Sequence, residues 1–267
     1  MKPDLVDMDM DDTLMTSENR VSDKTKAYLL LLQKNGVKIA LASGRPTAGM
    51  LPTAKSLKMD EFGSYIMSYN GAQTIELSNE EVVSKKVIEK AEFDKIVDFC
   101  REHELFVLTY HDDTIIYEGE HEYMNIESEL TGLPMKKVDD IKDYIQDAVP
   151  KVMGVDYEEH IAELIKKMDG EFDNEVDMTT SKPFFLEFMS KGVSKGEAIK
   201  KLAERLDLDV NQMVAFGDSA NDIEMFKVVG KAVAMNNASD EVKSYADMVT
   251  KSHDEDGIPY ALDQILS

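Results

Sequence analysis

The sequence has few of the residues that mark disulfide-stabilised or membrane-spanning proteins. It contains no tryptophan and a single cysteine in 267 residues. One cysteine excludes an internal disulfide, and the helical spacing around Cys100 predicts a small buried side chain. No apolar run approaches the roughly 20 residues that a membrane span needs, and no signal peptide is visible. We therefore expect a cytoplasmic protein that has no membrane partner.

Positive charge is also scarce. The chain has 30 Lys and Arg against 53 Asp and Glu, which gives a formal net charge of -23. Such an excess of acid repels the phosphates of nucleic acids and of anionic lipids, so we expect neither as a partner. A small anionic substrate would need a bound cation and a few Lys or Arg to reverse the field locally.

Strand and helix patterns alternate in the two end regions of the chain. Strands are expected at 5–8, 37–42, 65–67, 213–216, 232–234 and 248–249, with helices at 22–33, 46–57 and 195–206, from about 222 and 240, and at the C-terminal end. This alternation predicts an α/β fold with a Rossmann-like, doubly wound parallel sheet and helices on both faces. Ligands bind at the carboxyl ends of the strands in such sheets. The residues that follow these strands are therefore the candidates for a site.

The pattern changes between Asn70-Gly71, which predicts a type I′ hairpin turn, and about Lys191. Strands are expected there at 106–110, 114–117, 152–155, 176–178 and 184–188, and helices at 91–104, 120–131 and 158–168. The sequence thus predicts an inserted α+β domain at 84–188, and a core domain made of 1–83 and 189–267. Glu187 interrupts an apolar strand of the insert. One interpretation directs it into the active-site cleft, but we expect it on an exposed face.

Four carboxylates, Asp7, Asp9, Asp11 and Asp12, crowd into six residues at the end of the first strand and directly after it. One interpretation is a calcium-binding EF-hand loop that starts at Asp7, because Glu18 then falls at position 12. Two features count against it. Position 6, which needs glycine, is Asp12, and only six residues precede Asp7, too few for the first helix.

The second interpretation is phosphoryl transfer by Asp9-x-Asp11-x-Thr13. Side chains two apart at the end of a strand point the same way, so Asp9 and Asp11 can act on one group. Asp9 can present an oxygen to phosphorus while Asp11 reaches the leaving oxygen. This interpretation needs partners elsewhere in the chain.

Three later segments offer such partners. Ser43-Gly44-Arg45 follows a strand and begins a helix, where a hydroxyl and free N–H groups can hold a phosphate, although an ordinary helix start explains them equally. Ser194 has capping-box spacing, but Lys195 places a cation in the first helical turn, which is unfavourable unless an anion faces it. Candidate residues also follow the strand at 213–216, in the run Gly217-Asp218-Ser219-Ala220-Asn221-Asp222.

Together these four motifs, in this order, resemble the haloacid dehalogenase superfamily of phosphatases, in its Cof-type branch. The resemblance implies an α/β core with an inserted C2 cap of the C2B form, and a magnesium ion. It implies that Asp9 is the nucleophile, that Asp11 is the acid and base, and that Lys195 holds Asp9 and the phosphate. The other implied roles are phosphate or substrate binding by Thr13, Ser43, Gly44, Arg45, Asn70 and Asn221, metal binding by Asp9, Asp11, Asp218 and Asp222, and an alternative role for Asp222 in orienting Lys195.

One position departs from the family pattern. Glycine usually follows the second aspartate, and here it is Asp12, while Asp7 is unusual in a strand that should be buried. If Asp7 faces the same side as Asp9, we expect it to raise the affinity for metal; if it does not, it needs a hydrogen-bonding partner of its own.

Three functions are compatible with these motifs. The first is a phosphatase that acts on a small phosphorylated metabolite such as a sugar phosphate. The others are a phosphosugar mutase and a non-catalytic protein that binds metal or phosphate. The substrate, the residues that select it and the choice between monomer and dimer stay open.

Overall fold

The computed structural model describes residues 2–167, 172 and 175–267, which fall into two compact units. We call the first, Met1–Lys85 with Ser194–Ser267, the core unit, and the second, Lys86–Val193, the cap unit. Each unit has its own sheet and its own apolar core.

The core unit is built on an eight-stranded sheet with the order β14-β13-β12-β1-β2-β3-β4-β5. The six strands from β14 to β3 are parallel, and β4 and β5 continue the sheet antiparallel. The predicted parallel α/β sheet is confirmed, and the two antiparallel strands are an addition. The strands are β1 (Leu5–Met8), β2 (Lys38–Ala42), β3 (Tyr65–Ser68), β4 (Gln73–Glu76), β5 (Glu81–Lys85), β12 (Met213–Gly217), β13 (Lys231–Ala234) and β14 (Met248–Val249).

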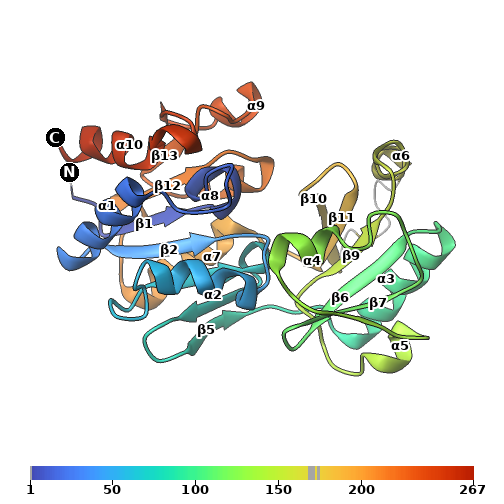
Figure 1. Ribbon diagram of the computed structural model, residues 1–267. Coiled ribbons are helices and arrows are strands. Elements are labelled where there is room, and N and C mark those ends of the chain that lie inside the picture. The colour runs from blue at the N-terminus through green and yellow to red at the C-terminus, as the bar shows by residue number, and fades with distance from the viewer. Residues whose placement is uncertain (1, 168–171, 173–174) are drawn as a thin grey trace. The chain divides into compact units, whose positions relative to one another are not determined.

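Helices cover both faces of this sheet (Figure 1). Alternate side chains of β1 divide between the faces, because neighbouring residues of a strand point in opposite directions. Val6 and Met8 pack with α1 (Asp23–Lys34), α2 (Thr47–Ser56) and α10 (Gly257–Leu266). Leu5 packs on the other side, against α7 (Lys195–Leu206), α8 (Ile223–Phe226) and α9 (Asp240–Lys243). On that second face the strands carry mainly alanine, which lets the helices approach closely.

The Asn70-Gly71 turn differs from the prediction. Its loop has four residues, because Ser68 pairs with Gln73, so it is not a two-residue type I′ turn. Tyr69 and Asn70 both have left-handed backbones, with φ of 52° and 56°. A side chain at Gly71 would put a Cβ 2.6 Å from the carbonyl oxygen of Ser194. Tertiary packing against the start of α7 therefore decides the shape of this turn.

The cap unit has a six-stranded sheet with the order β10-β11-β9-β6-β7-β8, antiparallel except for the β7–β8 pair. Its main apolar core lies between one face of this sheet and helices α3, α5 and α6. The elements are α3 (Lys90–Glu102), β6 (Phe106–His111), β7 (Thr114–Glu118), α4 (Ile126–Thr131), β8 (Met135–Lys137), α5 (Ile141–Tyr144), β9 (Val152–Val155), α6 (Glu158–Lys167), β10 (Val176–Thr180) and β11 (Phe185–Ser190).

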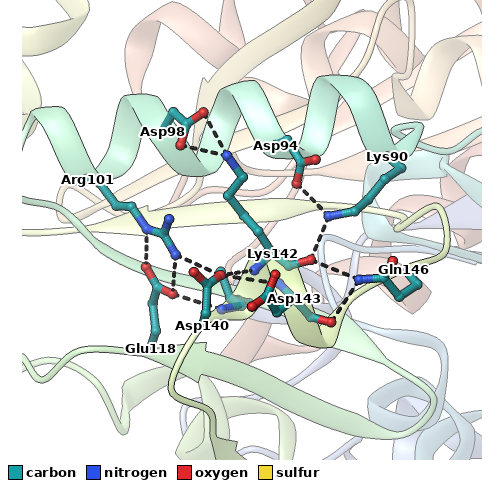
Figure 2. Close-up of polar contacts among 10 residues, drawn as sticks. Lys90, Asp94, Asp98, Arg101, Glu118, Asp140, Lys142, Asp143 and Gln146 are labelled. Atoms are coloured by element: carbon teal, nitrogen blue, oxygen red, sulfur yellow. Dashed lines mark hydrogen bonds and ion pairs between the residues drawn. The ribbon is translucent and has the colours of Figure 1, made fainter.

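Ion pairs and hydrogen bonds hold together the short helix α5, helix α3 and strand β7. Arg101 of α3 makes two hydrogen bonds to Glu118 of β7, at 2.7 and 2.8 Å (Figure 2). Lys142 of α5 reaches both oxygens of Asp98 at 2.8 Å. Asp140 caps α5 by accepting from the N–H groups of its first turn. A four-residue helix is stable here because its neighbours hold it.

Three predictions for the cap unit need adjustment. The helix expected at 120–131 begins only at Ile126, and β8 and α5 are not in the prediction. The helix expected at 158–168 is α6, which ends at Lys167, and Met168 lies outside the described residues. Glu187 is 1% exposed, so the expectation of an exposed face is wrong.

Candidate active site

The predicted site residues of the core unit come together from four segments of the chain. Asp9 follows β1, Ser43 follows β2, Asp218 follows β12, and Lys195 is the first residue of α7. The strands β12, β1 and β2 are adjacent and parallel, so their carboxyl ends lie at one edge of the sheet. This edge is where an open α/β sheet binds ligands.

Lys195 is fully buried between two carboxylates. Its Nζ lies 2.5 Å from Asp9 Oδ1 and 2.6 Å from Asp222 Oδ1. Ser194 caps the helix by accepting from the N–H of Glu197. Burial alone lowers the pKa of the Lys195 ammonium, but Asp222 and Asp9 outweigh it and raise the pKa above its usual range. Lys195 is therefore a permanent positive charge at the end of β1, as expected for a cation placed at a helix start.

Asp222 holds Lys195 with one oxygen and the chain after β12 with the other. Its Oδ2 accepts from the N–H groups of Asp218 and Ser219, both at 2.9 Å. A side chain at Gly217 would put a Cβ 2.5 Å from Cγ of Asp222. Glycine is needed at that position because the carboxylate folds back against the strand end.

Three carboxylates form the candidate metal centre. Asp9, Asp218 and Asp222 each offer an oxygen, and these oxygens lie within 4.8 Å of one another. Burial raises the pKa of Asp9 well above its usual range, which Lys195 opposes and the neighbouring carboxylates reinforce. Burial and Asp222 raise the pKa of Asp218 to about 6. Lys195 alone does not balance the negative charge of three carboxylates. A hard divalent cation would balance it and fits the all-oxygen donor set.

Asp11 is held by a guanidinium. Arg45 Nε donates to Asp11 Oδ2 at 2.9 Å and Nη2 donates to Asp11 Oδ1 at 2.6 Å. Nη2 also reaches Asn19 Oδ1 at 3.2 Å. Such a two-point contact fixes the plane of the carboxylate as well as its position. Arg45 is thus linked to the second aspartate of the motif.

Ser43, Asn70 and Asn221 form a connected group beside these acids. Ser43 Oγ accepts from the N–H of Arg45 at 3.1 Å, and the Ser43 carbonyl accepts from the N–H of Asn70 at 2.9 Å. Asn221 Nδ2 donates to Asn70 Oδ1 at 3.1 Å, and that oxygen also lies against Gly44. The Ser43-Gly44-Arg45 motif and the Gly217–Asp222 motif are therefore joined through Asn70, whose left-handed backbone turns it toward them.

Asp7 is a buried carboxyl whose role the sequence left open. It is fully buried, and within the described part of the chain neither oxygen has a hydrogen-bond partner. Burial raises its pKa to about 7, against the attraction of Lys195 and with a further contribution from Asp222. As the second residue before Asp9 in an extended chain, Asp7 points to the same side of the sheet.

Thr13 and Asn237 enter the site in ways that local sequence does not reveal. Thr13 Oγ1 donates to Asp218 Oδ1 at 2.8 Å, so in this structure it contacts the fourth motif. Asn237 donates to the carbonyl oxygen of Asp12, and no feature of the nearby sequence pointed to it.

Comparison with known proteins gives consistent results over the whole length. A family model described as haloacid dehalogenase-like hydrolase matches residues 6–262. "Putative phosphatase YxeH" of Bacillus subtilis is 30% identical over 98% of both chains. From the same organism, 5-amino-6-(5-phospho-D-ribitylamino)uracil phosphatase YwtE is 26% identical over 97% of both chains.

A solved structure is equally similar. The crystal structure of a haloacid dehalogenase-like hydrolase from Bacteroides thetaiotaomicron has a TM-score of 0.92 and 31% sequence identity. The match covers 99% of this chain and 100% of that one. Among the residues that the structure describes, none of the helices combines the length and the apolar composition needed to cross a bilayer.

Proposed function

The chain belongs to the haloacid dehalogenase-like hydrolases and is a phosphatase, and we propose that it hydrolyses a small phosphorylated metabolite through an aspartyl-phosphate formed on Asp9. The observation that carries this proposal is the buried contact of 2.5 Å between Lys195 and Asp9 at the end of β1. It keeps one cation directly beside the carboxylate that has to approach an anionic phosphoryl group.

In the first step an oxygen of Asp9 attacks phosphorus while the bond from phosphorus to the leaving oxygen breaks. Asp11 gives a proton to that leaving oxygen. In the second step Asp11 takes a proton from water, which attacks the phosphorus and releases phosphate from Asp9. Lys195 and Ser43 stabilise the charge on the phosphoryl oxygens.

Arg45 supports this sequence of steps through its contact with Asp11. A phosphate dianion competes with a carboxylate for a guanidinium, because both accept two parallel hydrogen bonds. Substrate binding then draws Arg45 toward the phosphate and frees an oxygen of Asp11 for proton transfer. Gly44, Asn70 and Asn221 complete the proposed phosphate site, and Thr13 acts beside them through its contact with Asp218.

The proposed cofactor is magnesium, held by Asp9, Asp218 and the backbone carbonyl of Asp11. When bound, it supplies positive charge that offsets the repulsion between a carboxylate nucleophile and a phosphoryl group. Asp222 is within reach as a further ligand, but its two oxygens already engage Lys195 and two N–H groups. Its first role in the proposal is to hold Lys195.

The proposed substrates are sugar or sugar-alcohol phosphates. The similar protein YwtE is named for a phosphate ester on a ribityl chain, which supports this class. A panel of phosphorylated metabolites, each assayed for phosphate release with magnesium, identifies the substrate most directly.

Asp9→Asn tests the proposed nucleophile. The variant is expected to lose magnesium-dependent hydrolysis of p-nitrophenyl phosphate, because an amide oxygen is too weak a nucleophile. Asp4→Asn is the matched control, since Asp4 is an exposed carboxylate just before the same strand. Unchanged turnover by Asp9→Asn rules out the assignment.

Asp11→Asn tests the intermediate separately. With p-nitrophenyl phosphate, whose leaving group needs little protonation, this variant is expected to form the aspartyl-phosphate and to hydrolyse it slowly. Acid quenching and mass spectrometry should then find a phosphoryl group on Asp9. A mutase would instead retain that group in the wild type and pass it to a phosphosugar.

A further inference from the structure

Asp12 has a backbone conformation that aspartate adopts only at a cost. Its φ is 59° and its ψ is 11°, in the left-handed region that favours glycine. A residue with a Cβ pays on the order of 1 kcal/mol there. Glycine adopts this conformation freely, so with aspartate here the chain needs another way to stabilise the turn.

The turn at Asp12 sets the direction of Asp11. Residues Met10–Leu14 form a single wide turn, which is closed by the N–H of Met15 donating to the carbonyl of Met10 at 2.8 Å. Asp11 precedes the left-handed residue with an extended backbone, with ψ of 128°. A change of φ at Asp12 would therefore reorient the peptide that joins the two aspartates.

Asn237 holds this turn from outside. Its Nδ2 donates to the carbonyl oxygen of Asp12 at 2.8 Å, and its Oδ1 accepts from the N–H of His253 at 3.2 Å. The two partners settle the orientation of the amide, because a flipped amide would face a carbonyl with its oxygen and an N–H with its nitrogen. Asn237 thus bridges Asp12 and the backbone at His253.

The segment that carries His253 is itself fixed. Ser252 and Glu255 form a capping box around His253–Glu255. Asp254 Oδ1 accepts from the N–H and the hydroxyl of Ser17, at 2.9 and 3.1 Å. The segment that follows β1 is therefore tied to the C-terminal turn at His253–Glu255 at two points. Asp12 is tied through Asn237, and Ser17 is tied through Asp254. We call Asn237, His253 and Asp254 the loop clamp.

We propose that Asn237 is a positioning residue for the reaction, which holds Asp12 in its left-handed conformation and thereby places Asp11 for proton transfer. The catalytic part of this inference rests on the proposed function, while the structural part does not. The loop clamp does in this chain what glycine at position 12 does by its own backbone freedom.

The structural part is tested by hydrogen exchange. Asn237→Ala is expected to speed amide exchange in the 10–17 segment several-fold, because the carbonyl of Asp12 loses the hydrogen bond from Asn237. The carboxylate of Asp12 keeps its longer contact with His253, with Oδ1 at 3.8 Å from Nε2. Asn236→Ala is the matched control, being the exposed neighbour of Asn237. Equal exchange in the two variants overturns the clamp whether or not the protein is active.

The catalytic part is tested with two leaving groups. We expect Asn237→Ala to lower kcat/KM for phenyl phosphate about 10-fold and that for p-nitrophenyl phosphate much less, because only the poorer leaving group depends strongly on the proton from Asp11. Equal losses, or none, overturn the positioning role. A wild type without magnesium-dependent turnover contradicts the proposed function instead, and the exchange experiment still decides the clamp.

Asp12→Gly supplies the decisive comparison. Glycine adopts the left-handed conformation freely, so the loss caused by Asn237→Ala should shrink several-fold when Asp12→Gly is also present. Exchange in the 10–17 segment should show the same coupling. An undiminished effect in the double variant means that Asn237 acts by some route other than the backbone of Asp12.

Discussion

Thr13 Oγ1 donates a hydrogen bond of 2.8 Å to Asp218 Oδ1, which joins two residues 205 positions apart in the chain. The second oxygen of Asp218 accepts from Ser219 Oγ at 3.1 Å. Both oxygens of the carboxylate are therefore oriented by hydroxyl groups, and each keeps lone pairs for a further partner. As the proposed metal ligand, a carboxylate oriented in this way needs no rearrangement when a cation binds.

Thr13→Val is expected to weaken activation by magnesium. The valine keeps the shape of threonine but leaves Asp218 without its donor, and losing such a supporting bond typically costs 10-fold or more in metal affinity. Magnesium titrations of hydrolysis, together with calorimetric binding of the metal alone, measure the effect. Thr13→Ser, which retains the hydroxyl, should stay close to wild type, and an equal loss in both variants would refute the explanation.

Asp7 is expected to make stability fall as pH rises. Its pKa is about 7 in the folded protein and 3.8 in an ordinary environment, so the folded state holds the proton more tightly than the unfolded chain. The stabilising contribution of protonated Asp7 is complete below about pH 4 and is lost as pH rises through about 7. The difference corresponds to roughly 4 kcal/mol at most.

Asp7→Asn measures this contribution. The variant should match wild type in its free energy of unfolding near pH 4 and exceed it at pH 8, because the amide carries no charge that burial opposes. Urea unfolding in the presence of EDTA at both pH values separates the effect from metal binding. A constant difference between variant and wild type across this range would show that Asp7 does not titrate there.

Lys151 and Glu187 form a buried ion pair inside the cap unit. Lys151 Nζ lies 3.0 Å from Glu187 Oε1, the same oxygen accepts from Ser181, and both side chains of the pair are 2% exposed. Lys151→Met is expected to destabilise the cap unit by about 3–5 kcal/mol, because it removes a cation that faces the buried Glu187 carboxylate. Urea unfolding followed by cap-specific probes measures the change.

The double variant Lys151→Met/Glu187→Met distinguishes charge from packing. It should be less destabilised than the sum of the single variants, since it removes both members of the buried pair together. Lys137→Met, which breaks the exposed contact with Glu120, is the control and should change little. Additive single effects would mean that the pair is not coupled.

Cys100 is expected to be inert until the cap unit opens. It is a fully buried residue of α3 that faces β9, and burial, with a smaller contribution from Glu118, raises the pKa of its thiol above the usual range. Because the thiolate is the reactive form, iodoacetamide at pH 8 should label the native protein only when the cap unit unfolds locally and exposes the thiol. Mass spectrometry of the labelled chain measures the rate, and rapid labelling without denaturant contradicts the burial.

The core strands could be predicted from sequence because both faces of the sheet are covered. A strand buried on two sides is a continuous apolar run, as in Leu41 and its neighbours, and it needs no distant information to be recognised. The residues after β1, β2 and β12 could also be predicted as a site, because the topology of a parallel sheet brings these strand ends together.

The short elements of the cap unit could not be predicted in this way. Helix α5 has four residues and depends on ion pairs such as Lys142 with Asp98, which no local pattern contains. Glu187 was assigned to an exposed face because a lone acid in an apolar strand usually points to water. Its partner Lys151 lies 36 positions earlier, beyond any window of periodicity.

For this protein the sequence by itself determined where the candidate site lies, because the residues of each motif are close neighbours and follow recognisable strands. Asp9, Asp11 and Lys195 are predicted as site residues by their spacing and by the unfavourable charges that they would otherwise place together, and their proposed roles rest on the family resemblance. Only the tertiary structure decided which groups hold them. The contacts of Thr13 with Asp218 and of Asn237 with Asp12 join segments more than 200 positions apart, and such contacts depend on the packed fold, because local spacing carries no information about them.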